Sequence, residues 1–244
     1  MPLIAMNRLL QHALENTYAV GYFESWNLES LLAVVDAAEK TKSPVIIGFN
    51  GMFLGNDERP VAENVYHYGS LCKAIAEQAT VPVSLLLNEA NKVQLLVQAL
   101  QAGFNGIMYV DEQTGVDGLA VSVGNVHLLE RRKATLDFDL IQTLRKKIPV
   151  PLVLHGATGI VDEELHAAIR LGMCKINVGT AFKRIYLNAL KTYFRDHDVD
   201  RLNPHEILGK GGNLDLLNAA REMIAAEVIR LIQLFGSEGK AHLL

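Results

Sequence analysis

Two short stretches decide the fold of this chain: Val153-Leu-His-Gly-Ala-Thr-Gly-Ile160 and Cys174-Lys-Ile-Asn-Val-Gly-Thr180. Each is an apolar run that ends in Gly, Thr or Asn, and a helical pattern follows each one. Parallel barrel strands have this form where their carboxyl ends deliver polar groups into a pocket. Two such ends in succession offer backbone N–H groups and hydroxyls to a phosphate, with His155 beside the first. Either stretch alone favours a buried strand with an ordinary turn, whereas the pair, spaced by one helix, favours a phosphate site.

The same alternation of strand-like and helix-like segments runs through the whole chain. Seven strand patterns are present, at residues 18–23, 44–49, 81–87, 106–110, 119–123, 151–154 and 175–178. Continuous apolar strands predict a parallel sheet covered on both faces, and βα units of about 30 residues predict a TIM (β/α)8 barrel. We expect residues 1–244 to form a single barrel domain with a C-terminal helical extension at about 203–240.

One connection is too short for this fold. The fourth strand pattern ends near Asp111 and the next begins near Gly118, whereas a parallel crossover takes about a dozen residues or more. A barrel needs eight strands, so one βα unit is apparently missing. Either the protein has lost this unit or the sequence omits residues between 111 and 118. Omission is the favoured interpretation, because a barrel without one strand exposes two sheet edges.

Composition excludes several classes of function. The net charge of −4 argues against nucleic acid or an anionic membrane as the main partner. No apolar run has the length of a membrane span, and the first residues lack the pattern of a signal peptide. Cys72 and Cys174 are isolated in apolar patterns, which is typical of buried thiols in a reducing compartment. We expect a soluble, cytoplasmic protein.

At these residues the chain resembles the class II, metal-dependent fructose-bisphosphate and tagatose-bisphosphate aldolases, which are ketose-bisphosphate aldolases. The resemblance runs nearly end to end. It is most specific in Gly124-Asn-Val-His127, followed by His155-Gly-Ala-Thr-Gly159 and Lys175-Ile-Asn-Val-Gly-Thr180. It implies a barrel with zinc or another divalent metal ion, and reversible aldol cleavage of a phosphorylated ketose to dihydroxyacetone phosphate and an aldehyde. It also implies a homodimer or homotetramer.

The resemblance further implies which residues form the site. His127 and His155 match metal ligands of the family, although either histidine alone is more typical of a hydrogen-bonded residue at the barrel rim. Two phosphate-binding segments and one asparagine after the first strand are matched by Gly156, Ala157, Thr158, Asn177, Val178, Gly179, Thr180 and Asn27. In these segments the threonines would donate hydroxyls, and the glycines would let the backbone approach the phosphate.

The third strand departs from the family pattern. The family has His-x-Asp-His there, with the Asp as proton donor and the last His as a zinc ligand, whereas this chain has Leu86-Leu-Asn-Glu89. The amide of Asn88 cannot donate and recover a proton. Glu89 can complete a His2Glu metal site with His127 and His155, or act as a general base. Asn88 and Glu89 are therefore the candidate catalytic residues, and a site that has lost its chemistry is an equal alternative.

Two smaller departures also indicate a site that differs from that of the family. Leu128 follows His127 where the family has a phosphate-binding glycine, and Glu24 replaces an asparagine after the first strand. Three functions are left open: a class II aldolase-like lyase, a non-catalytic sugar-phosphate-binding homologue that has lost the acid and one metal ligand, and a TIM-barrel sugar-phosphate isomerase or hydrolase with Glu89 as base.

Overall fold

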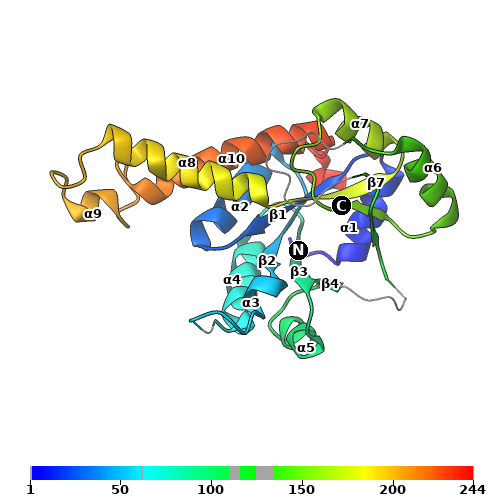
Figure 1. The fold of residues 1–244 in the computed structure, drawn as a ribbon, viewed down its shortest axis with the longest axis horizontal. Coiled ribbons are helices and arrows are strands. Elements are labelled where there is room, and N and C mark those ends of the chain that lie inside the picture. Colours follow the sequence, from blue (N-terminus) through cyan, green and yellow to red (C-terminus); the bar gives the residue numbers. More distant parts are fainter. Residues whose placement is uncertain (1, 62, 110–115, 125–134, 244) are drawn as a thin grey trace.

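The computed structural model describes residues 2–61, 63–109, 116–124 and 135–243, and their fold is a curled parallel sheet with helices on its outer face (Figure 1). The sheet has seven strands in the order β4-β3-β2-β1-β7-β6-β5. The strands are β1 (Val20–Ser25), β2 (Val45–Asn50), β3 (Val83–Ala90), β4 (Gly106–Tyr109), β5 (Leu119–Val121), β6 (Leu152–Leu154) and β7 (Met173–Val178).

In the described residues a helix follows every strand except β4, as the sequence predicts. They are α1 (Met6–Glu15), α2 (Leu28–Thr41), α3 (Gly51–Leu54), α4 (Val65–Gln78), α5 (Val93–Gln101), α6 (Phe138–Lys147), α7 (Asp162–Arg170), α8 (Thr180–Asp196), α9 (Pro204–Ile207) and α10 (Leu216–Phe235), and a 3-10 turn spans Lys240–Leu243. Polar residues begin several of them. Asn27 caps α2 in a capping box with Ser30, and Asn50 caps α3, so the chain turns directly from β2 into a helix.

Alternate residues of the strands face two different cores. The outer core lies between the sheet and the helices, where Phe23 packs edge-to-face on Phe182 and stacks on Phe235. The inner core contains Val20 and Tyr22 of β1, together with residues of α1. Helix α1 packs against β1 and β7, so its apolar residues cover this side of the curled sheet.

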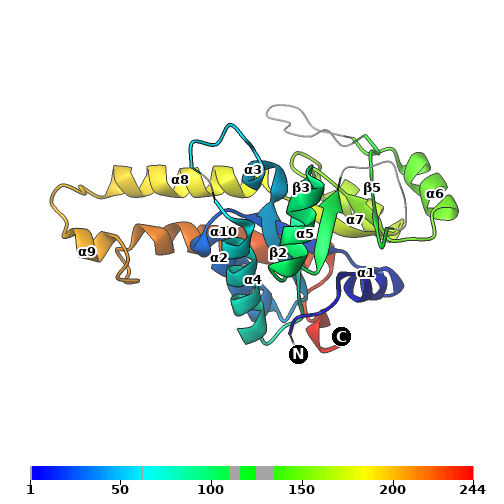
Figure 2. The same cartoon turned by 90° about the horizontal axis from the view of Figure 1, so that it is seen from below.

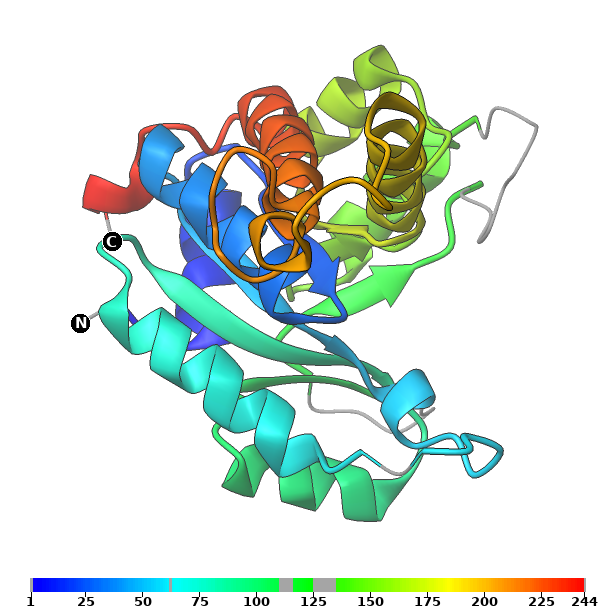
Figure 3. The same cartoon turned by 90° about the vertical axis from the view of Figure 1, so that its left-hand side faces the viewer.

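The predicted parallel α/β architecture is confirmed, and all seven predicted strands are present. A closed eight-stranded barrel is not formed by the residues that the structure describes, because β4 pairs only with β3 and β5 only with β6 among them. The sheet is therefore an open barrel (Figure 3). Most of the short connection from Asp111 to Gly118 lies outside the described residues.

The C-terminal region forms a helical arm. Helices α8 and α10 run side by side beyond the sheet, with α9 at their far end (Figures 1 and 2). Near the sheet, α10 buries Ile224, Val228 and Phe235 against the outer core. Within the described ranges, no helix is both long and apolar enough to cross a membrane.

Candidate functional site

A cavity of about 300 Å³ lies at the carboxyl ends of β1, β2, β3, β6 and β7. Parallel register brings these strand ends to one rim, since Asn50 of β2 pairs with Asn88 of β3, and Tyr22 of β1 pairs with Asn177 of β7. Its lining residues are Tyr22, Glu24, Asn50, Met52, Phe53, Asn88, Glu89, His155, Gly156, Thr158, Asn177, Val178, Gly179, Thr180 and Lys183. Active sites of parallel barrels are built at this end.

Most of the predicted site residues line this cavity. The exceptions are Ala157, Asn27 and His127. Ala157 is buried, and its N–H donates to the carbonyl of Asn177 at 3.3 Å. The side chain of Asn27 accepts the N–H of Ser30 at 2.9 Å and does not line the cavity, because it is used as the cap of α2. His127 lies outside the described residues.

His155 and Glu89 meet at the rim. The Nε2 atom of His155 lies 3.1 Å from Oε1 of Glu89, and their side chains are 12% and 19% exposed. Glu89 has a φ of +53°, in the left-handed region that non-glycine residues seldom adopt. An imidazole nitrogen and a carboxylate oxygen at this spacing suit neighbouring ligands of one divalent ion. Within the part of the chain that is described, no third His, Cys, Asp or Glu joins them in a metal-binding group.

Asn50 joins the two carboxylates of the cavity. Its Oδ1 accepts the N–H groups of Met52 and Phe53 at 3.0 and 3.3 Å, which fixes the orientation of the amide. Its Nδ2 therefore points the other way, and donates to Oε2 of Glu24 at 3.1 Å and to Oε2 of Glu89 at 2.5 Å. The cap of α3 thus holds both acidic side chains in place.

Lys183 is the cation of the cavity wall. It lies in the first turn of α8, and its Nζ donates to Oε1 of Glu24 at 2.5 Å. The ammonium group also lies 4.5 Å from the centroid of the Phe53 ring, a cation–π contact. Glu24 is buried and borders Gly179, where an added Cβ would lie 3.3 Å from the carboxyl carbon of Glu24.

The floor of the cavity is a chain of amides that ends on a buried lysine. Asn177 donates to Oδ1 of Asn88 at 3.3 Å, and Lys175 donates to Oδ1 of Asn177 at 2.5 Å. Burial lowers the pKa of Lys175 from 10.5 to about 7. Burial, with Glu24 and Glu89 adding to it, raises the pKa of Tyr22 well above 10, so the phenol of Tyr22 stays protonated.

Several residues of the site are not among those predicted from the sequence. They are Glu24, which the sequence marks only as a departure from the family, and Asn50, Lys183, Tyr22 and Phe53. Glu24 and Asn50 carry a usable signal, since each is the first polar residue after an apolar strand pattern, like His155. Lys183 lies one turn into a helix, and no local pattern distinguishes it from the other lysines of that helix.

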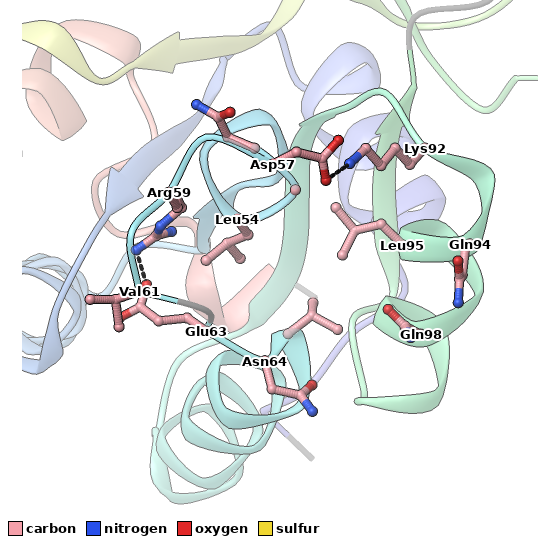
Figure 4. Close-up of a pocket in the computed structure, with 13 residues that line it drawn as sticks. Leu54, Asp57, Arg59, Val61, Glu63, Asn64, Lys92, Gln94, Leu95 and Gln98 are labelled. Atoms are coloured by element: carbon pink, nitrogen blue, oxygen red, sulfur yellow. Dashed lines mark hydrogen bonds and ion pairs between the residues drawn. The ribbon is translucent and has the colours of Figure 1, made fainter.

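A second and larger cavity, of about 550 Å³, lies between the α3–α4 connection and α5 (Figure 4). Two charged pairs line this cavity. Lys92 Nζ lies 2.6 Å from Oδ1 of Asp57, and Arg59 pairs with Glu63. None of the predicted site residues lines it. The smaller cavity at the strand ends is therefore the candidate site, because it alone of the two joins the imidazole, the carboxylates and the glycine-rich segments.

The family model of class-II fructose-bisphosphate aldolases matches residues 4–111 and 109–240. The chain belongs to this family. Its members generally use a divalent metal ion and act on phosphorylated ketoses. The two matched segments meet at the end of β4 (Gly106–Tyr109), where the chain continues towards β5 without a helix in the described residues.

Relatives of the chain in this family match along nearly its whole length. The fructose-bisphosphate aldolase of Geobacillus stearothermophilus is 29% identical over 303 aligned positions that cover 99% of each protein. The crystal structure of the YdjI aldolase from Escherichia coli K12 is 28% identical, has a TM-score of 0.82, and covers 98% of this chain and 99% of that one. The structure of a putative fructose-1,6-biphosphate aldolase from Coccidioides immitis shares the fold, with 21% identity, a TM-score of 0.78 and 98% coverage of both chains.

Proposed function

We propose that the protein is a metal-assisted lyase that cleaves and forms a phosphorylated ketose by aldol chemistry. The products of cleavage are dihydroxyacetone phosphate and an aldehyde. The observation that carries this proposal is the 3.1 Å approach of His155 Nε2 to Glu89 Oε1, at the rim of a cavity that the two glycine-rich segments also line. This proximity supports the proposal that the pair binds a metal ion while the glycine-rich segments bind the phosphate of the same ligand.

The phosphate would bind between Gly156–Thr158 and Asn177–Thr180. The first residue of α8 is Thr180, and no side chain caps this helix in the part of the chain that the structure describes. Its first N–H groups therefore suit an anion, which the positive end of the helix dipole also favours. The hydroxyls of Thr158 and Thr180 add two donors at the same cavity wall.

The residues present fit a divalent metal ion. His155 and Glu89 would supply two ligands, and His127 is proposed as the third. When bound, the ion supplies positive charge that polarises the ketose carbonyl. Asn50 donates to Glu89 and so fixes the direction of its carboxylate. Hydrogen bonds of this kind, from a neighbouring residue to a metal ligand, commonly orient the ligands of metal sites.

Proton transfer requires a group other than Asn88. Its Oδ1 accepts from Asn177, so Asn88 helps to hold the phosphate segment in place. We propose Glu89 as the acid–base residue. In cleavage its carboxylate takes the proton of the substrate hydroxyl on the carbon beyond the breaking C–C bond. That bond's electron pair stays on the dihydroxyacetone phosphate fragment, whose carbon then takes up a proton from solvent, and the other fragment leaves as the aldehyde. In condensation Glu89 returns the same proton.

We also propose that the chain lacks one βα unit between β4 and β5 relative to its family. Two observations support this. The family model matches in two segments that meet at residues 109–111, and the alignment with the Geobacillus stearothermophilus enzyme extends over 303 positions whereas this chain has 244 residues.

The proposed function is tested by incubating the purified protein with ketose bisphosphates, among them fructose and tagatose bisphosphate, and measuring dihydroxyacetone phosphate. We expect equimolar triose phosphate and aldehyde, loss of turnover with a chelator, and recovery with zinc. Borohydride should not inactivate the enzyme, since no Schiff base forms. A product with the carbon number of the substrate would identify an isomerase. Ligand binding without turnover would identify a binding protein.

A further inference from the structure

The charge of the cavity does not favour a phosphate by itself. The described residues that line it carry two carboxylates, on Glu24 and Glu89, and one ammonium group, on Lys183. With His155 neutral, their formal charges sum to −1. With a divalent ion bound at His155 and Glu89 the sum becomes +1, and beside the start of α8 the charges of Glu24 and Lys183 cancel at short range, where such interactions are strong. The attraction that a phosphate experiences in the cavity therefore depends on the existing contacts of Lys183.

Lys183 is already paired with Glu24, and the two side chains differ in how firmly they are held. The carboxylate of Glu24 is 9% exposed and is held on its other oxygen by Asn50 at 3.1 Å. Lys183 is 37% exposed, and its long side chain lies over the ring of Phe53. The fixed partner is thus the anion and the adjustable partner is the cation.

The pair stands beside the proposed phosphate position. Glu24 borders Gly179, the residue that precedes α8, and Lys183 lies in the first turn of that helix. An anion at the start of α8 would approach both groups. Lys183 would attract this anion and Glu24 would repel it. The anion could form a close ion pair with Lys183 only if the Glu24–Lys183 contact lengthened.

We propose that Glu24 determines ligand specificity by competing with the ligand's phosphate for Lys183. This inference rests on the proposed function, because it requires a phosphorylated ligand in the cavity. Glu24 weakens the binding of a bare phosphate, since it neutralises Lys183. A phosphate ester that also carries a hydroxyl compensates, because that hydroxyl can donate to Glu24 in place of the ammonium group. The cavity therefore selects hydroxylated phosphate esters, such as dihydroxyacetone phosphate, over inorganic phosphate.

The test compares the affinities of the zinc-loaded protein for inorganic phosphate and for dihydroxyacetone phosphate by titration calorimetry. The variants are Glu24→Gln and Lys183→Met, singly and together. Glu222→Gln on α10 and Lys191→Met on α8 are the controls, because both residues are exposed and neither lines the cavity. Thermal unfolding of each variant checks that it is folded.

We expect Glu24→Gln to raise the affinity for inorganic phosphate about tenfold. The ratio of the affinities for dihydroxyacetone phosphate and inorganic phosphate should fall. Lys183→Met should weaken both ligands, and more so in the Glu24→Gln background than in the wild type. The controls should bind as the wild type does. If the wild type binds the ligands but Glu24→Gln leaves phosphate affinity unchanged or lower, the competition is refuted and the proposed function stands. If Glu24→Gln does not fold, the Lys183→Met variant alone decides. An equal loss of affinity for inorganic phosphate and for dihydroxyacetone phosphate in that variant would refute the competition. If no protein binds either ligand, the proposed function fails and the competition fails with it.

Discussion

His155 and Glu89 lie 3.1 Å apart although they follow strands that are far apart in the sheet. Glu89 belongs to β3 and His155 follows β6, and three strands, β2, β1 and β7, separate these two in the sheet order. Only the curl of the sheet brings the two side chains together. The contact therefore shows that the open barrel retains the curvature that an active site at the strand ends requires.

Replacing Glu89 tests its proposed roles. We expect Glu89→Gln to lower kcat at least about 100-fold, since a general acid–base group contributes on that order. Zinc affinity should fall as well, because an amide is a weaker ligand than a carboxylate. Steady-state kinetics and zinc titration measure the two effects separately. Glu222→Gln on α10 is the control. Wild-type turnover in Glu89→Gln would exclude Glu89 as the proton carrier.

Restoring the family pattern should strengthen metal binding. In the double variant Asn88→Asp with Glu89→His, we expect zinc affinity to rise at least about tenfold, because neutral imidazole is a preferred zinc ligand. The backbone at 89 accepts this change, since its φ of +53° lies in a region where His is enriched among non-glycine residues. Unchanged zinc affinity and unchanged turnover would show that Leu86–Glu89 does not correspond to the family's metal-binding strand.

Gly48 is required by the close approach of β2 and β3. A Cβ added there would lie 1.8 Å from the carbonyl oxygen of Leu86, which is backbone and cannot turn aside. We expect Gly48→Ala to lower the free energy of unfolding by about 3 kcal/mol, as overpacking does. Gly212→Ala, where nothing lies within 4 Å, should change it by less than about 0.5 kcal/mol. Chemical denaturation of both variants provides the comparison, and equal stabilities would contradict the packing described.

Lys175 makes stability depend on pH in the alkaline range. Its pKa is lowered from 10.5 to about 7 by burial, so between these values the unfolded chain holds a proton that the folded chain has released. Stability from this group therefore rises with pH in that window, and the full cost of burying the charge applies below it. We expect the free energy of unfolding of the wild type to rise relative to Lys175→Met by about 1 kcal/mol per pH unit from about pH 7.5 to 9.5.

Denaturation curves at several pH values check this expectation, with Lys191→Met as the control, because that lysine is exposed on α8. Above about pH 10.5, where the unfolded chain has also released the proton, the difference in stability between the wild type and Lys175→Met should no longer change with pH. Curves that stay parallel across the whole range would mean that Lys175 keeps an ordinary pKa inside the sheet.

Periodicity and strand composition were enough to predict the architecture. All seven strands were found because each is an apolar run bounded by a helical pattern, and the short connection after Asp111 was found because crossover length is a geometric requirement. The open edges at β4 and β5 could be expected from the strand count. The helical arm could not, since the direction in which α8 and α10 extend depends on packing between distant parts of the chain.

The candidate site was predicted in part, for a related reason. Gly156 and Thr158 come after β6, and Asn177 is the last residue but one of β7, so local pattern places them at the rim. Asn27 follows a strand too, but its side chain is used by the helix that begins there. The Glu24–Lys183 pair joins residues 159 positions apart, and only the tertiary structure shows that the two groups meet.

The central claim is that His155 and Glu89 form part of a working metal site, and the metal content of the purified protein tests it most directly. Elemental analysis of the wild type, of His155→Ala and of the exposed control His205→Ala should be made after incubation with zinc and gel filtration. We expect about one zinc per chain in the wild type and the control, and a loss of most of it in His155→Ala. An equal zinc content in all three, or none in any of them, would contradict it.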